Sequence, residues 1–170
     1  MKGNASKVVI VFGLPGSGKS YFASQLARSI HAKHLSSDQL RKKMFEYRSY
    51  SEEEKLSVYE EMLVIVKGLL AANENVVLDA TFYKDEIRSR FLDELKEDAE
   101  VLFIEVRASE SIIKERLKGK RPDSEANFSI YEKIKKQWEP MVDDHLILQS
   151  TNDNISRMIL RGIKYFQQDD

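Results

Sequence analysis

Cysteine is absent from this chain of 170 residues, which excludes disulfides and cysteine chemistry. Histidine occurs only three times and without close spacing, so a structural zinc site is not expected. No apolar run approaches the roughly 20 residues of a membrane-spanning helix, and residues 1–7 contain no apolar signal-peptide core. We therefore expect a cytoplasmic protein that does not insert into a membrane.

An excess of charge of either sign is also lacking, because 27 basic and 28 acidic residues leave a formal net charge of −1. This balance disfavours a strongly basic nucleic-acid binder, although it does not exclude a local basic groove. With 42% hydrophobic and 32% charged residues, the composition is typical of a globular protein. No repeat or low-complexity linker interrupts it, so we predict a single domain over residues 1–170. Nothing in the sequence predicts the oligomeric state.

The clearest motif is the stretch Gly-Leu-Pro-Gly-Ser-Gly-Lys-Ser at residues 13–20, which fits the phosphate-binding P-loop pattern G-x-x-x-x-G-K-[ST]. An unbroken apolar run at 8–12 precedes it, and apolar residues follow at helical spacing as far as Ile30. The motif therefore lies at a strand-to-helix turn, where backbone N–H groups and the helix dipole can hold phosphates. Lys19 would add charge for the β- and γ-phosphates, and the Ser20 hydroxyl would ligate Mg²⁺. The alternative is a chance glycine-rich turn.

Strands and helices are expected to alternate along the whole chain, which predicts a three-layer α/β/α fold of the P-loop NTPase class with a five-stranded parallel sheet. The expected strands are 7–12, a weak candidate at 33–36, 76–79, 101–106 and 146–148. The expected helices are 19–30, 38–47 capped by Ser37 and Asp38, 52–72, 84–97, 109–118 capped by Ser109, 128–142 and 153–166. Ligands bind such sheets beyond the carboxyl ends of the strands.

Two aspartates follow predicted strands and are candidates for chemistry at that edge. Asp38 could orient an acceptor hydroxyl and take its proton, although a plain helix cap would also use aspartate. Arg41, one turn further on, could hold an anionic part of the acceptor or be simply solvated. Asp79 ends an apolar strand as a metal-side carboxylate does, or forms a polar turn, and Thr81 could contact the acceptor or a metal-bound water.

A basic run extends from Lys114 through Arg116 and Lys118 to Lys120 and Arg121. Such runs are usually solvated surfaces. Here the run enters a proline-containing loop, which suits a lid over about 118–127 that closes on ATP. Arg116 and Arg121 are favoured over the lysines because guanidinium groups bind phosphate in a bidentate manner.

Several other residues are interpreted as structural. Arg88 and Arg90 are expected to be surface charges, and Tyr131 and Trp138 to pack in the interior. The three histidines (His31, His34 and His145) are expected to be structural or exposed. The buried stripe of the 52–72 helix is predicted to consist of Leu56, Tyr59, Met62, Leu63, Val66 and Leu69.

The order of these motifs resembles small P-loop kinases of the AAA_33 type over about residues 7–140. The similarity rests on the P-loop, Ser37-Asp38-Gln39-Leu40-Arg41, Leu78-Asp79-Ala80-Thr81, Glu115-Arg116-Leu117 with Lys120-Arg121, Tyr131-Glu132-Lys133 and Trp138-Glu139-Pro140. The chain is also similar to the kinase half of phage polynucleotide 5′-kinases and, more distantly, to zeta toxins. A nucleoside-kinase-like fold with a short lid is what this resemblance implies.

In polynucleotide kinases the aspartate that matches Asp38 is the base, and the arginine that matches Arg41 contacts a phosphate of the acceptor. The lid arginines there match Arg116 and approximately Lys120 or Arg121. The chain departs from the phage pattern at Asp79-Ala80-Thr81, where the phage aspartate falls one place later, and in its Lys-Arg-Pro lid. These departures concern the acceptor and leave the nucleotide half intact.

The sequence thus predicts a kinase that uses ATP and Mg²⁺ to phosphorylate a hydroxyl of a small molecule or of a nucleic-acid 5′ end. The competing hypothesis is a nucleotide-dependent switch that controls a partner protein. Asp38 with the basic lid favours the kinase, since a switch needs neither. Catalysis is assigned to Lys19, Asp38, Arg116 and Arg121, acceptor binding to Asp38, Arg41, Asp79 and Thr81, and the metal to Ser20 and Asp79. Nucleotide binding is assigned to Gly13, Pro15, Gly16, Ser17, Gly18, Lys19, Ser20, Tyr21, Arg116 and Lys120.

Overall fold

The computed structural model describes residues 5–119 and 127–168. Its strands are β1 (Lys7–Phe12), β2 (Lys33–Ser36), β3 (Val76–Ala80), β4 (Glu100–Arg107) and β5 (Leu146–Gln149). Its helices are α1 (Lys19–Ser29), α2 (Ser37–Met44), α3 (Glu52–Ala71), α4 (Asp85–Leu95), α5 (Glu110–Lys118), α6 (Phe128–Gln137) and α7 (Ile155–Phe166). Within these ranges, no helix is long and apolar enough to span a membrane.

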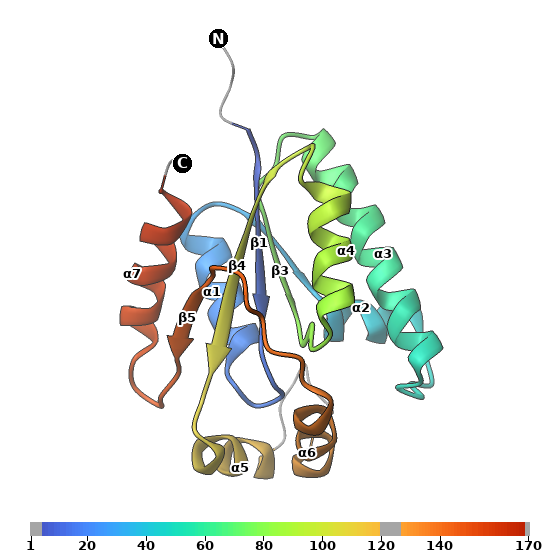
Figure 1. Ribbon diagram of the computed structural model, residues 1–170, viewed down its shortest axis with the longest axis vertical. Coiled ribbons are helices and arrows are strands. Elements are labelled where there is room, and N and C mark those ends of the chain that lie inside the picture. Colours follow the sequence, from blue (N-terminus) through green and yellow to red (C-terminus); the bar gives the residue numbers. More distant parts are fainter. Residues whose placement is uncertain (1–4, 120–126, 169–170) are drawn as a thin grey trace.

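The strands form one parallel sheet in the order β2-β3-β1-β4-β5, which confirms the predicted five-stranded fold. Strand β1 lies in the sheet between β3 and β4. The carboxyl end of β1 is therefore flanked by the ends of two other strands, and sheets of this kind bind ligands at this edge. The P-loop starts there. Figure 1 shows α5 and α6 beyond the same edge, below the arrowheads of β1 and β4.

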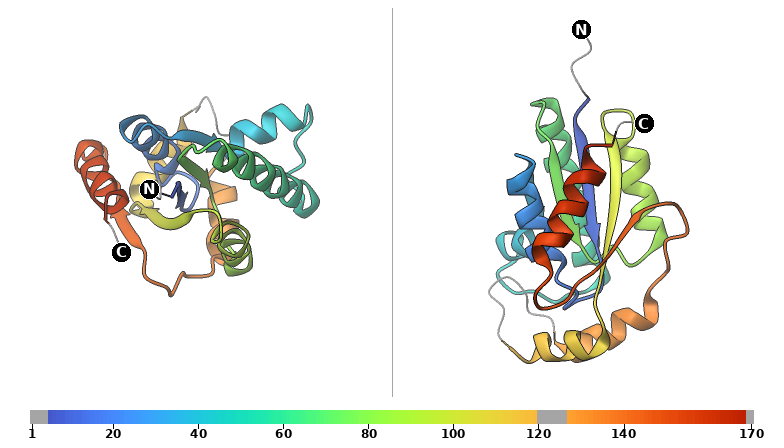
Figure 2. Two further views of the ribbon diagram at one scale, coloured as in Figure 1. Left: turned by 90° about the horizontal axis from the view of Figure 1, so that it is seen from above. Right: turned by 90° about the vertical axis from the view of Figure 1, so that its left-hand side faces the viewer.

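Alternation along the strands produces the two apolar layers. Val8, Ile10 and Phe12 pack with α3 and α4, whereas Val9 and Val11 face α1 and α7. Figure 2 shows these helix pairs on opposite faces of the sheet. A third, smaller cluster joins α5 to α6 through Ile113, Leu117 and Tyr131, so these two helices form a separate cover over the carboxyl edge.

Two predicted helices are shorter than expected. The α2 helix ends at Met44 rather than Tyr47, because Phe45 is already extended. The α6 helix ends at Gln137 rather than Val142, since Trp138 is extended and Pro140 disfavours helical geometry at the residue before it. The cap of α2 is Ser36, whose hydroxyl accepts from the N–H of Gln39, so the predicted cap at 37–38 was off by one residue. The Ser109 cap of α5 is confirmed.

Two predictions of exposure were wrong. Leu56, expected in the buried stripe of α3, is 46% exposed, and Val58 and Leu70 are buried on that helix. Arg88, expected at the surface, is fully buried and donates to the carbonyls of Phe82 and Glu139 at 2.6 Å each. A sequence pattern could not reveal this role, because both partners are backbone atoms of loops. Tyr131 is buried as predicted, and Trp138 stacks on Phe12.

Candidate active site

The P-loop joins β1 to α1 and has the backbone that the motif predicts. Gly16 and Gly18 have φ values of 80° and 93°, a region that side chains with a Cβ avoid. Gly18 is the N-cap of α1, and no side chain of the described residues caps this helix end. The first N–H groups of α1 therefore face the loop, and together with the helix dipole they favour an anion there.

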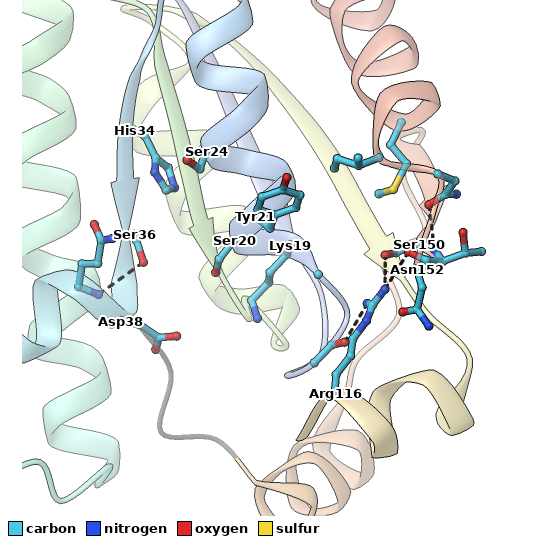
Figure 3. Close-up of a pocket in the computed structure, with 17 residues that line it drawn as sticks. Lys19, Ser20, Tyr21, Ser24, His34, Ser36, Asp38, Arg116, Ser150 and Asn152 are labelled. Carbon is cyan, nitrogen blue, oxygen red and sulfur yellow. Dashed lines mark hydrogen bonds between the residues drawn. The ribbon is translucent and has the colours of Figure 1, made fainter. Parts of the chain in front are cut away.

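A cavity of about 720 Å³ opens beside the P-loop, and we call it the larger cavity. The residues that line it come from the P-loop and α1, from β2 and α2, from α5, and from α7 and the loop that precedes it. They are Gly16, Gly18, Lys19, Ser20, Tyr21, Ser24, His34, Ser36, Asp38, Gln39, Arg116, Ser150, Thr151, Asn152, Asn154, Ile155 and Met158. In Figure 3, Asp38 lies on one side of Lys19 and Arg116 on the other.

Asp79 is brought to the P-loop by the pairing of β1 with β3. The Ser20 hydroxyl donates to Asp79 Oδ1 at 2.7 Å, and His34 Nε2 contacts Asp79 Oδ2. The carboxylate is almost fully buried, and both of its oxygens are thus engaged. His34 was expected to be structural or exposed, but it lines the larger cavity. Its position depends on the register of β2 with β3, which pairs Ser36 with Asp79, and a sequence does not specify that register.

The Ser20 hydroxyl and the Asp79 carboxylate are hard oxygen ligands that fit a magnesium ion at this point. Among the described residues, no three His, Asp or Glu side chains gather as a metal site. In nucleotide sites, Mg²⁺ commonly binds through one or two protein oxygens and takes its other ligands from phosphates and water.

Arg116 reaches from α5 to the P-loop. Its guanidinium donates to the carbonyl of Gly16 at 3.2 Å, to Ser150 Oγ at 3.0 Å and to the carbonyl of Thr151 at 3.0 Å. It therefore connects the phosphate end of the larger cavity with the loop after β5. Lys120 and Arg121, the other predicted lid cations, lie outside the described residues. Tyr21 lines the larger cavity and is 61% exposed.

A second cavity of about 120 Å³, which we call the smaller cavity, lies next to the first. Lys19 and Asp38 line both cavities and so mark where they meet. The smaller cavity is lined by residues from the P-loop, α2, α3, the segment after β3, and α6. They are Pro15, Lys19, Ser37, Asp38, Arg41, Tyr50, Lys55, Val58, Tyr59, Thr81, Tyr83, Ile130, Lys133 and Ile134.

Arg41 is held in this cavity by residues of α3 and the loop before it. Arg41 Nε lies 3.2 Å from Glu54 Oε1, its Nη1 lies 3.9 Å from Asp38 Oδ1, and its guanidinium stacks over the ring of Tyr50 at 4.6 Å. Burial alone would raise the pKa of Glu54, but hydrogen bonds from Ser49 and Tyr50 and the charge of Arg41 hold that pKa below its ordinary value. Glu54 therefore stays ionised and fixes the Arg41 guanidinium. The sequence analysis missed Glu54, which resembles any acidic residue of a first helical turn.

The opposite wall follows β3. Tyr59 accepts from the N–H of Phe82 at 3.3 Å, and burial raises the pKa of the Tyr59 hydroxyl, which stays protonated. Phe82 has a φ of 44°, a strained backbone for a phenylalanine, and Arg88 binds its carbonyl. Thr81, predicted to face the acceptor, lines the smaller cavity between these residues. Arg88 thus fixes the backbone of Phe82, and with it the neighbouring residues Thr81 and Tyr83 that line the smaller cavity.

Solved structures similar to this chain include several kinases, although identity is low. The APS kinase CysC of Mycobacterium tuberculosis, in complex with AMPPNP and APS, has a TM-score of 0.77 at 16% identity over 98% of this chain and 100% of that chain. A gluconokinase from Sinorhizobium meliloti has a TM-score of 0.69 at 20% identity over 98% and 100%. A chain of the Pnkp1/Rnl/Hen1 RNA repair complex has a TM-score of 0.64 at 23% identity over 80% of this chain and 45% of that chain.

These likenesses establish a P-loop kinase-like fold. A search of curated proteins found no match. The AAA_33 family model, described as an AAA domain, matches residues 8–141. This span contains all the lining residues of the smaller cavity and those of the larger cavity up to Arg116. The chain therefore belongs to the AAA_33 family, as the order of its motifs predicted.

Proposed function

We propose that the protein is an ATP- and Mg²⁺-dependent kinase that transfers the γ-phosphoryl group to a hydroxyl of an acceptor in the smaller cavity. The observation that carries this proposal is the sharing of Lys19 and Asp38 by two adjacent cavities of very different size. A kinase needs a nucleotide site and an acceptor site that meet at the transferring group. A nucleotide switch needs only the first.

In the proposed reaction, the acceptor hydroxyl oxygen attacks the γ-phosphorus, the bond from that phosphorus to the bridging oxygen of ADP breaks, and Asp38 takes the hydroxyl proton. Lys19 stabilises the negative charge of the transferring group from the P-loop side. Ser20 and Asp79 would hold Mg²⁺, which when bound neutralises charge on the β- and γ-phosphates. Arg116 holds the phosphate end of the larger cavity against the loop after β5.

Asp38 is well suited to a test, because Ser36 and not Asp38 caps α2. We expect Asp38→Asn to keep ATP binding and to lower single-turnover phosphoryl transfer by roughly 10²–10⁴-fold, the usual contribution of a general base. A suitable control is Asp93→Asn, which changes an exposed carboxylate of α4.

The assay combines an ADP-release screen against hydroxyl acceptors, including 5′-hydroxyl oligonucleotides, with nucleotide titration of both variants. Equal transfer rates in Asp38→Asn and the unchanged protein would remove Asp38 from catalysis. If no acceptor is phosphorylated and a partner protein instead binds only the ATP-loaded form, the switch replaces the kinase.

A further inference from the structure

We propose that the acceptor is a small anion, a hydroxyl compound whose carboxylate or phosphate is bound by Arg41, Lys55 and Lys133 in the smaller cavity. This inference rests on the proposed function and adds the chemical class of the acceptor. It concerns Lys55 on α3 and Lys133 on α6, which the sequence analysis did not assign to a site.

The charges that line the smaller cavity are unequal. Four cations line it, Lys19, Arg41, Lys55 and Lys133, and Asp38 is the one carboxylate among its described lining residues. Glu54 and Glu52, the ion-pair partners of Arg41 and Lys55, are not lining residues. Even with these two partners counted, the four cations outnumber the three carboxylates, and a surplus of positive charge favours an anion.

The cations differ in how firmly they are held. The side chains of Arg41 and Lys55 are only 11% and 16% exposed, and Lys55 Nζ lies 3.3 Å from the hydroxyl of Tyr83. Within the described part of the chain, no carboxylate lies within ion-pair distance of Lys133, an exposed residue of α6. Two cations are thus fixed at the wall, and Lys133 can complete the site with a charge-assisted hydrogen bond.

The size and walls of the smaller cavity favour a small molecule over a polymer. Its volume of about 120 Å³ is a sixth of the larger cavity, and Val58, Ile130 and Ile134 contribute apolar walls. The two isoleucines belong to α6, which is packed on α5 beyond the sheet edge (Figure 1). A nucleic-acid strand needs an open basic groove that follows its backbone. The hydroxyls of Tyr59 and Tyr83 would instead suit the hydroxyls of a small acceptor.

Matched compounds that differ only in the anionic group test this inference. The probes are glycerol against glycerate and glycerol 3-phosphate, ribose against ribose 5-phosphate, and a 5′-hydroxyl oligonucleotide. We measure ADP release at saturating Mg-ATP, and calorimetric binding of each probe to protein saturated with Mg-AMPPNP. We expect the anionic member of at least one pair to exceed its neutral partner by about 10-fold or more in kcat/KM and in affinity, as one charge-assisted hydrogen bond provides.

The variants Lys55→Met and Lys133→Met should raise the KM for the anionic probe by about 10-fold or more while the neutral partner is unaffected and Mg-ATP affinity stays constant. Lys136→Met, one turn further along α6 and outside the cavity, is the control. Lys133→Glu should reject the anionic probe still more strongly.

Each alternative outcome overturns the inference. Neutral compounds that react as well as their anionic partners would leave the kinase intact and refute an anion site. The oligonucleotide as the only acceptor would identify a polynucleotide kinase and refute a small acceptor. If no probe is phosphorylated and none binds the Mg-AMPPNP form, a small anionic acceptor is refuted. The kinase proposal itself is tested separately, by the wider acceptor screen and the Asp38→Asn variant.

Discussion

The two cavities that meet at Lys19 and Asp38 are built in different ways. At the larger cavity, the phosphate end consists of consecutive P-loop residues whose backbone geometry is fixed by Gly16 and Gly18. The smaller cavity is built from side chains of five separate segments. The first kind of site needs a short motif and a helix start, whereas the second depends on how helices pack. This difference explains why the sequence predicts the nucleotide site as a whole, whereas it predicts only some residues of the acceptor site.

The largest effect on nucleotide affinity is expected at the junction of the two cavities. Lys19→Ala removes the charge nearest the β- and γ-phosphates, and a hydrogen bond to a charged group contributes about 1.5–3 kcal/mol. We expect Mg-ATP affinity to fall by roughly 10–150-fold while the protein stays folded. Calorimetry with Mg-ATP measures this. Lys96→Ala, an exposed lysine at the end of α4, is the control and should change nothing. Unchanged affinity in Lys19→Ala would refute the nucleotide assignment of the larger cavity.

The effect expected at Arg88 is on stability and on the acceptor half, and not on nucleotide affinity. Arg88→Ala leaves the buried carbonyl of Phe82 and that of Glu139 without their donor, so we expect a loss of about 2–4 kcal/mol in the free energy of unfolding. Urea denaturation measures it. Arg90→Ala, two residues on, breaks only a surface pair with Glu60 and should cost less than about 1 kcal/mol.

The two cavities can be compared further by measuring Mg-ATP affinity and the KM for the acceptor in Arg88→Ala, at a low temperature where this variant is folded. Mg-ATP affinity should be retained, because Arg88 does not line the larger cavity and its hydrogen bonds go to the carbonyls of Phe82 and Glu139. The KM for the acceptor should rise, because Thr81 and Tyr83 line the smaller cavity. A loss of nucleotide affinity equal to the loss of acceptor affinity would show that the two halves are not separable.

The smallest effect is expected from pH at Glu54. Its pKa is held below the ordinary value of 4.5, so its ionised form stabilises the fold at and above neutral pH. That contribution is fully present above the ordinary pKa and is lost as pH falls through the lowered pKa of the folded state. Glu54→Gln should therefore be less stable than the unchanged protein at pH 7 and should lose less stability on acidification. Denaturation between about pH 7 and pH 3 measures this.

Glu53→Gln changes the neighbouring exposed carboxylate and is the matched control. It should follow the unchanged protein across the whole range. If Glu54→Gln also follows that curve, Glu54 does not hold Arg41 through a charge. Nucleotide affinity should not respond to Glu54 at any pH in this range, since Glu54 touches only the acceptor half.

Much of the fold could be predicted because its signals are local. Apolar runs predicted four of the five strands, whereas β2 was only a weak candidate, and Ser109 predicted the start of α5. The errors concern the burial of side chains that depends on contacts with distant residues. Arg88 is buried because two loop carbonyls need a donor, and Leu56 is exposed although it fits the apolar spacing of α3.

The candidate site divides in the same way. Asp38, Arg41, Asp79 and Thr81 were predicted because they lie at or shortly after the carboxyl end of a strand, and the carboxyl ends of parallel strands meet at one edge. His34, Lys55 and Lys133 were missed because strand register and helix packing bring them to the cavities. Glu54 was missed because its role depends on its contact with Arg41 of another helix. The pairing of β2 with β3 joins strands that are separated in the sequence by α2 and α3, and the contact of α6 with α5 depends on side-chain packing between two helices.

The most direct test of the account is a crystal structure of the protein with Mg²⁺ and AMPPNP. The account predicts that the base and ribose occupy the larger cavity and that the γ-phosphate lies between Lys19 and Asp38, facing the smaller cavity. It also predicts the metal beside Ser20 and Asp79. A γ-phosphate directed away from Asp38, or a nucleotide that fills the smaller cavity, would contradict the division into a nucleotide half and an acceptor half.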